Sequence, residues 1–175
     1  MTGARILACL RCNRGAALSE FVLIVPAMIL MLTGVVEVTS LLRLDRKLQN
    51  AAYATADLAT QSPNLSDARL ADIFTASDLV VQPFAASGLA VGIVSVVYDP
   101  DDGVPAVDWN ESLRGGTVPN ATVTAAGLGP PGDSVVIVRA TYQYVPIFGD
   151  YVFGTINLSE TAIARPRRSA VVSRD

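Results

Sequence analysis

With 175 residues, the chain has room for one ordinary domain and an appended segment. Its 51% hydrophobic and 17% charged residues are too apolar for a disordered protein. The absence of histidine excludes a Ser-His-Asp triad and a histidine metal site. The formal net charge is −3, and the basic residues form no face suited to nucleic acid. One small basic cluster near the C-terminus is expected to be a solvated tail: Arg165, Arg167, Arg168 and Arg174.

Residues 1–15 form a basic segment ahead of the longest apolar run. This segment holds three arginines and no acidic residue: Arg5, Arg11 and Arg14. Both cysteines, Cys9 and Cys12, also lie there, in a C-x-x-C spacing. A redox motif would need a strand–helix context, and zinc would need two further ligands, yet the chain has no third cysteine. We interpret residues 1–15 as a cytoplasmic leader with reduced thiols.

Residues 16–36 form an apolar run of 21 residues. About 20 residues at 1.5 Å each cross a hydrocarbon core of about 30 Å. The rival interpretation is a signal peptide, whose apolar region is usually only about 7–15 residues and ends at a small-x-small site. A buried core helix would be weakened by Pro26 and Gly34. We therefore predict a retained transmembrane helix over residues 16–36.

Charge counting leaves the orientation of this helix open. Three basic residues precede the apolar run, and three follow it: Arg43, Arg46 and Lys47. The positive-inside rule counts Lys and Arg rather than net charge, so equal numbers do not decide which end is cytoplasmic.

Residues 37–62 are expected to continue the helix beyond the membrane. Neither Pro nor Gly occurs between 38 and 61, and Pro63 should end the helix. Apolar or small residues recur there at alternating intervals of three and four: Leu41, Leu44, Leu48, Ala51, Thr55 and Leu58. This stripe can pack on the chain's own domain or form a coiled coil with a partner, and we favour the first.

Residues 63–175 are predicted to form an exported α+β domain. Residues 64–75 suit a short second helix with Ser66 as its N-cap. Three segments rich in β-branched or alternating apolar residues predict strands at 89–98, 134–145 and 156–164. Short turn-rich connections imply an antiparallel sheet of three or four strands, with residues 44–58 covering its apolar face.

The chain offers little chemistry for catalysis. No glycine-rich phosphate loop is present. Residues 99–103 (DPDDG) resemble the start of a calcium loop, but Val104 and Asn110 stand where that loop needs glycine and glutamate. Four N-x-S/T triplets are short enough to occur by chance. We expect no enzymatic activity, no cofactor and no metal site.

One acidic residue, Glu20, lies inside the apolar run. A charge in a bilayer helix costs about 2.5–3.5 kcal/mol at the centre and less toward the ends. Glu20 could be a charge at the membrane margin whose carboxylate reaches water. A second interpretation comes from the residues around it.

Residues 15–21 (GAALSEF) resemble the processing motif of type IV pilins and pseudopilins. In that motif a prepilin peptidase cuts after a glycine, and glutamate is the fifth residue of the mature chain. Residues 26–37, with Pro26, Gly34 and Glu37, are similar to the TadE-like proteins of the tight-adherence (Flp) pilus system, as are residues 48–56 and 161–167. The resemblance is dense over residues 14–60 and thin over 63–130.

The resemblance implies that a prepilin peptidase recognises Gly15, Ala16, Glu20 and Phe21 and cuts after Gly15. Cleavage would create an ammonium group on Ala16, four residues from Glu20. Because residues i and i+4 share a helix face, this amine and the carboxylate can form an ion pair that serves assembly. Phe21 replaces the tyrosine of the major Flp pilins, which favours an accessory pseudopilin over the main filament subunit.

The resemblance further implies a pilin-like fold and a minor role in assembly of Flp pili. The protein would be a single-pass protein of the bacterial inner membrane, with its N-terminus cytoplasmic and its C-terminal domain periplasmic, and incorporation in the pilus stays open. Expected partners are the prepilin peptidase, other pilins or pseudopilins, the inner-membrane assembly platform and membrane lipid, and not nucleic acid. Two alternatives remain: an uncleaved membrane-anchored envelope binding protein, and a membrane-tethered enzyme with histidine-free chemistry.

Overall fold

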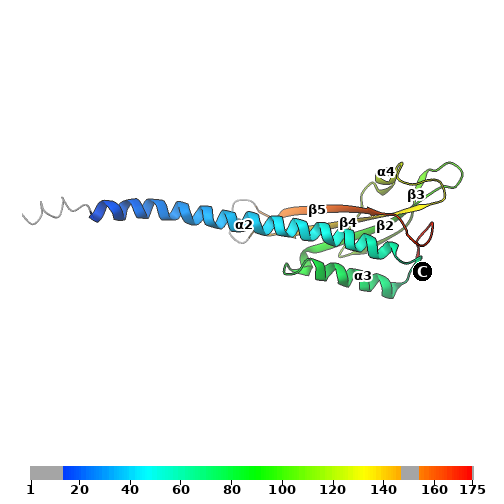
Figure 1. The fold of residues 1–175 in the computed structure, drawn as a ribbon, viewed down its shortest axis with the longest axis horizontal. Helices are drawn as coiled ribbons and strands as arrows, with labels where there is room; N and C mark the ends of the chain where they lie inside the picture. Colours follow the sequence, from blue (N-terminus) through cyan, green and yellow to red (C-terminus); the bar gives the residue numbers. More distant parts are fainter. Residues whose placement is uncertain (1–13, 147–153, 175) are drawn as a thin grey trace, which may run out of the picture.

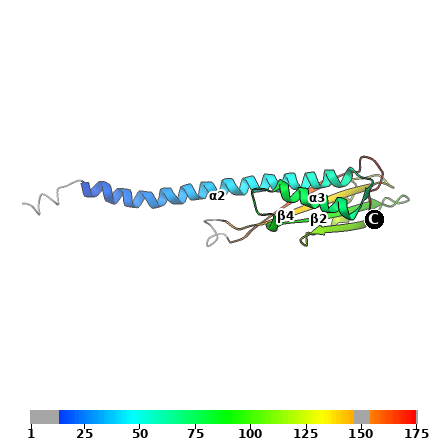
Figure 2. The same cartoon turned by 90° about the horizontal axis from the view of Figure 1, so that it is seen from below.

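A single helix, α2 (Arg14–Thr60), runs through the apolar segment of residues 16–36 and into the domain. In this computed structural model the structure describes residues 14–146 and 154–174, and the side chains of residues 14–17 lie outside that description. The expected leader, with Cys9 and Cys12, therefore falls almost entirely outside the described residues. The helix has 47 residues, which corresponds to about 70 Å. Figures 1 and 2 show it extending as a rod well beyond the domain, which gathers around its C-terminal end.

The continuous helix predicted across residues 16–62 is confirmed, with Pro26 inside it. The prediction for the second helix is only partly right. Ser66 is its N-cap, but α3 spans Asp67–Val80 rather than 64–75. Its start is later because β1 (Asn64–Leu65) pairs in parallel with β6 (Ser173–Arg174) at the other end of the chain. It continues further because no Pro or Gly occurs before Pro83.

Four antiparallel strands form the main sheet in the order β3-β2-β4-β5. Strands β2 (Leu89–Tyr98) and β5 (Ile156–Ala164) have the predicted bounds, and β4 (Ser134–Tyr144) ends one residue early. Strand β3 (Pro105–Leu113) was not predicted from the sequence. It is an edge strand that starts with proline and exposes most of its side chains, so its apolar signal is weak.

Both faces of the sheet are covered. Helices α2 and α3 lie on one face, and the short helix α4 (Ala121–Ala125) lies over the other (Figure 1). Along β2, Val91 and Ile93 belong to the cluster under α2, while Val94 and Val96 belong to the cluster under α4. Burial on both sides explains why this strand is a continuous apolar run rather than an alternating one.

The stripe of α2 packs on the chain's own domain, as predicted. Leu44, Leu48 and Ala51 have no exposed surface and join the core under the sheet. The hydroxyl of Thr55, also buried, lies 2.6 Å from that of Ser77 in α3, so a hydrogen bond joins the two helices inside the core. The C-terminal half of α2 is therefore an integral layer of the domain.

Shortening a buried side chain of α2 should make the domain less stable. We expect Leu48→Ala to lower the free energy of unfolding of the full chain by about 2–5 kcal/mol, because it removes a buried side chain and leaves a cavity. Leu42→Ala is the matched control, since Leu42 is 57% exposed on the same helix. Thermal denaturation in detergent measures both, and equal losses for the two variants would contradict the packing described here.

Candidate functional site

The N-terminal half of α2 has no cover within the described chain. No side chain from residue 18 to residue 36 is buried, and Leu23 and Met31 are 80% and 76% exposed. Among the described residues this is the one helix long and apolar enough to cross a membrane, with a mean hydropathy of 2.4 over its best window. A core helix of similar composition would be buried in its own domain. An apolar surface of this length needs either lipid or other helices around it.

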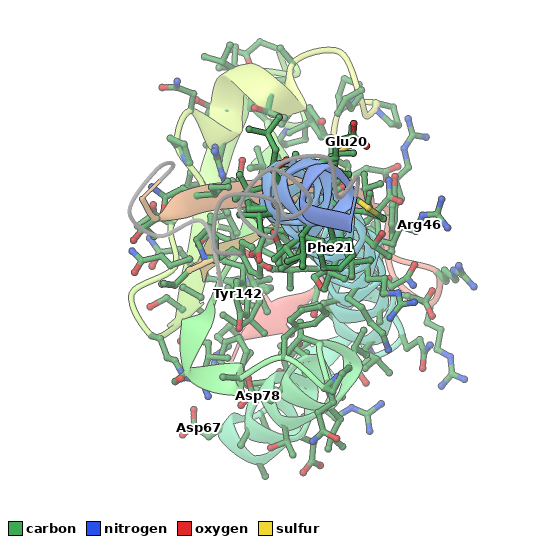
Figure 3. The ribbon with its side chains drawn as sticks, turned by 90° about the vertical axis from the view of Figure 1, so that its left-hand side faces the viewer. Glu20, Phe21, Arg46, Asp67, Asp78 and Tyr142 are labelled. Atoms are coloured by element: carbon green, nitrogen blue, oxygen red, sulfur yellow. The ribbon has the colours of Figure 1, made fainter. Side chains whose placement is uncertain are left out.

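Glu20 and Phe21 are both exposed and leave α2 on different sides (Figure 3). Gly15 and Ala16 belong to the first turn of the same helix, although their side chains lie outside the described residues. Four residues separate Ala16 from Glu20, which places them about 6 Å apart along one helix face. The helix therefore brings Ala16 and Glu20 to the same face and Phe21 to another.

Apolar side chains lie on both sides of the exposed helix, the side of Phe21 and the side of Glu20. Phe21 shares its side with Val25, Met28 and Leu32, in a wholly apolar strip. On the side of Glu20, the helical repeat places the small residues Ala27 and Gly34 together with the larger Ile24 and Met31. A Cβ atom at Gly34 would meet nothing within 4 Å, so the chain's own packing does not require glycine there. Small residues on a membrane helix allow a second helix to approach closely.

A hydrogen bond joins the domain to α2 where the apolar segment ends. The hydroxyl of Tyr144, the last residue of β4, donates to Oε1 of Glu37 at 2.6 Å. A small apolar pocket of about 250 Å³ adjoins this pair, lined among others by Gly34, Leu41 and Ile156. The contact ties the anchor-facing end of the sheet to the first turn beyond residue 36.

Burial raises the pKa of Tyr144 to about 12, and the hydrogen bond to Glu37 and the charge of its carboxylate act in the same direction. The phenol therefore stays neutral and remains a donor throughout the physiological range. Glu37 was named from the sequence as one of the residues similar to those of TadE-like proteins. Its partner was not, although the two tyrosines that end β4, Tyr142 and Tyr144, were the available signal.

The prediction of a solvated C-terminal basic cluster is wrong for Arg174, whereas Arg165, Arg167 and Arg168 are exposed. Arg174 forms ion pairs with Glu111 of β3 and with Asp67 of α3, and only 15% of its side chain is exposed. It also donates to the carbonyl oxygen of Leu65 at 3.0 Å. Three segments far apart in sequence meet at this guanidinium, so Arg174 has a structural role. Arg167 pairs with Asp57 of α2, in a more exposed contact.

Within the described residues, no group of three or more acidic, cysteine or histidine side chains could hold a metal ion. The features that remain are the exposed apolar helix, the carboxylate within it and the domain fixed to its far half. They define a helix that is long and apolar enough to cross a membrane and that carries an α+β domain.

The TadE-like protein family model matches residues 15–57, all of which lie in α2. The match confirms the resemblance drawn from the residues around Gly15 and Glu20, and it makes this segment TadE-like. It spans both the exposed half of the helix and most of the half that packs in the core. No curated protein and no solved structure matches the chain.

The hydrogen bond between Tyr144 and Glu37 should stabilise the fold in a pH-dependent way. A hydrogen bond to a charged group contributes about 1.5–3 kcal/mol, so Tyr144→Phe should lower the free energy of unfolding by about that amount. The pKa of Tyr144 is higher in the folded chain than the usual 10. Its stabilising effect is therefore complete below about pH 10 and is lost as the pH rises toward 12.

Urea denaturation of the parent protein and of Tyr144→Phe in detergent, at a series of pH values, measures the difference in their free energies of unfolding. Tyr53→Phe is the control, because Tyr53 is 55% exposed on α2. If Tyr144→Phe and the parent chain have the same free energy of unfolding at neutral pH, the role assigned to this contact is wrong.

Proposed function

We propose that the protein is a minor, non-enzymatic, pseudopilin-like component that takes part in assembly of Flp pili and is processed by a prepilin peptidase after Gly15. The TadE-like match suggests involvement in tight-adherence pilus assembly in general. The observation that carries the finer proposal is the position of Glu20. The single carboxylate between residues 15 and 36 lies within the exposed part of a TadE-like helix, one turn from Ala16.

Cleavage after Gly15 would give that carboxylate a partner. The new ammonium group on Ala16 would lie on the face of Glu20, within the chain or against the carboxylate of a neighbouring subunit. A charge at the membrane margin that gains an opposite charge is less costly than a lone one. The exposed helix would then pack against other pilins or pseudopilins through its uncovered apolar surface, and Gly34 would allow a close approach near the end of that surface.

This role requires a defined orientation. The N-terminus would face the cytoplasm, where the peptidase and the inner-membrane assembly platform are reached, and the domain would lie in the periplasm. The same fold without cleavage would be an anchored envelope binding protein, so processing is the property that separates the two functions.

A substitution at the cleavage position should block processing. We expect Gly15→Val to leave a full-length precursor, because a branched side chain crowds the backbone that the peptidase must grip. Removal of the leader takes away three arginines and no acid, so the formal charge of −3 becomes −6 in the processed form. The two forms should separate by mass and by isoelectric focusing.

Gly34→Val is the matched control, since it makes the same change in the same helix and should still be cut. N-terminal sequencing identifies the mature end. If the parent protein keeps Met1 to Gly15 in cells with an active prepilin peptidase, the proposed processing is wrong and the uncleaved anchor is favoured.

Glu20 should matter after cleavage rather than for it. We expect Glu20→Ala and Glu20→Gln to be cut yet to support few or no surface pili, because the amine on Ala16 is left unpaired in a setting of low dielectric constant. Glu20→Asp should be intermediate, since its shorter side chain reaches the amine less well. Immunoblots report cutting, and electron microscopy counts the filaments. Normal assembly by Glu20→Gln would leave processing intact and exclude the ion pair.

A further inference from the structure

A basic groove lies on α2 just beyond the apolar segment. We call it the juxtamembrane groove, and its volume is about 420 Å³. Volumes of about 300–1,000 Å³ are typical of sites for small ligands. Its lining comes from α2 and from the turn after α3: Ser40, Arg43, Arg46, Lys47, Asn50, Pro83 and Phe84.

The charge of the groove is not compensated by the chain. Arg43, Arg46 and Lys47 follow one another at i, i+3 and i+4, so they lie on one side of α2. Within the described residues, none of the three forms a salt bridge, and no acidic residue lines the groove. Arg114, Arg167 and Arg174 differ, since each of them pairs with a carboxylate. Three uncompensated cations in one hollow indicate an anionic ligand.

The groove has the right height to meet a membrane surface. Ser40 and Lys47 lie four and eleven residues beyond Val36, or about 6 and 17 Å along the helix axis. The headgroup layer adds about 5–7 Å on each side of the hydrocarbon core. Side chains of a helix lean toward its N-terminus, and long basic side chains extend further, so these cations reach back toward the anchor. Seen along the anchor, Arg46 projects away from α2 on the side opposite Tyr142 (Figure 3).

The other wall of the groove is held in place by the sheet. The hydroxyl of Tyr142 donates to the carbonyl oxygen of Ala85 at 2.8 Å, next to Phe84. Phe84 itself packs against the hydrophobic core while it lines the groove. An apolar ring can lie at the boundary between headgroups and acyl chains, so Phe84 suits a location beside the cations. The groove is therefore formed before any ligand enters.

We propose that the juxtamembrane groove binds the headgroup phosphate of an anionic phospholipid, in the leaflet on the domain's side of the membrane. Each basic residue near an anionic surface adds to the attraction, and three in one groove favour an anionic lipid over a zwitterionic one. The bound lipid would fix the rotation of α2 and the tilt of the domain at the membrane. The proposal rests on the spanning helix of the proposed function, but not on cleavage or pilus assembly.

The test uses the full-length chain purified in dodecyl maltoside micelles. Native mass spectrometry measures binding of added phosphatidylglycerol, with phosphatidylcholine as the zwitterionic arm and inorganic phosphate as the free-anion arm. We expect phosphatidylglycerol to bind roughly tenfold more tightly than phosphatidylcholine, and the triple variant R43Q/R46Q/K47Q to lose roughly tenfold or more of that affinity. R43K/R46K should keep most of it, because the positive charge is retained.

The control R69Q/R167Q/R168Q removes the same number of charges at the end of the domain that lies away from the anchor. Arg69 is in the first turn of α3, which follows the C-terminal end of α2, and Arg167 pairs with Asp57 there. This control should bind phosphatidylglycerol as the parent chain does.

Three outcomes would overturn the proposal. They are unchanged binding by R43Q/R46Q/K47Q, an equal loss in the control, and displacement of the lipid by inorganic phosphate at equal concentration. The last would show a site for a free anion. A chain that is cut and assembled in cells but fails this test leaves the proposed function standing. A chain that passes it and is never cut retains the lipid site alone.

Discussion

Burial of α2 against the four-stranded sheet is the constraint on which the rest of the structure depends. The helix contributes Leu44, Leu48 and Ala51 to the core, and without them one face of the sheet would be open to water. Each fully buried large apolar side chain contributes about 1.5–3 kcal/mol relative to an exposed one. The same helix begins at Arg14, about 45 Å along its axis before Leu44. The domain and the N-terminal half of the helix therefore cannot move independently without breaking either the helix or the core.

The structure assigns different kinds of interaction to the two halves of the helix. The C-terminal half is satisfied inside the chain, by apolar packing and by the buried hydroxyl pair of Thr55 and Ser77. The N-terminal half is left for lipid or for other helices, and Glu20 is the residue on it whose charge needs a partner. Between them, Tyr144 binds Glu37 and marks the boundary. The TadE-like match covers the exposed half of α2, the boundary at Glu37 and most of the packed half, so it includes the part of the helix that belongs to the domain core.

The parts predicted from sequence are those with a strong local pattern. The long helix follows from an apolar run of 21 residues and from the stripe at intervals of three and four beyond it, and β2 and β5 follow from β-branched or alternating runs. Edge strand β3 was missed because none of its side chains is fully buried, so its sequence lacks a clear apolar pattern although its backbone pairs with β2. The pairing of β1 with β6 joins the two ends of the domain, and no local pattern encodes it.

The candidate site divides in the same way. Gly15, Ala16, Glu20 and Phe21 were proposed from their resemblance to the pilin processing motif, and only the helix faces on which they lie follow from their spacing. Tyr144 could not be predicted, because its position beside Glu37 depends on how a strand more than 100 residues later lies on the helix. The same holds for Arg174, whose partners come from α3 and β3. From the sequence Arg174 was expected to be part of a solvated tail, because its charge follows from its residue type and its ion pairs depend on the fold.

The division of α2 between membrane and domain is the central claim, and spin-label accessibility tests it most directly. Cys9 and Cys12 are replaced by serine, and single labels are attached through Leu30→Cys and Leu42→Cys. The two leucines are 72% and 57% exposed, so both labels face the surroundings of the helix rather than the core. In lipid vesicles, the label at position 30 should collide more often with oxygen and the label at 42 more often with a water-soluble nickel complex. Equal access of the nickel complex to both positions would contradict the account.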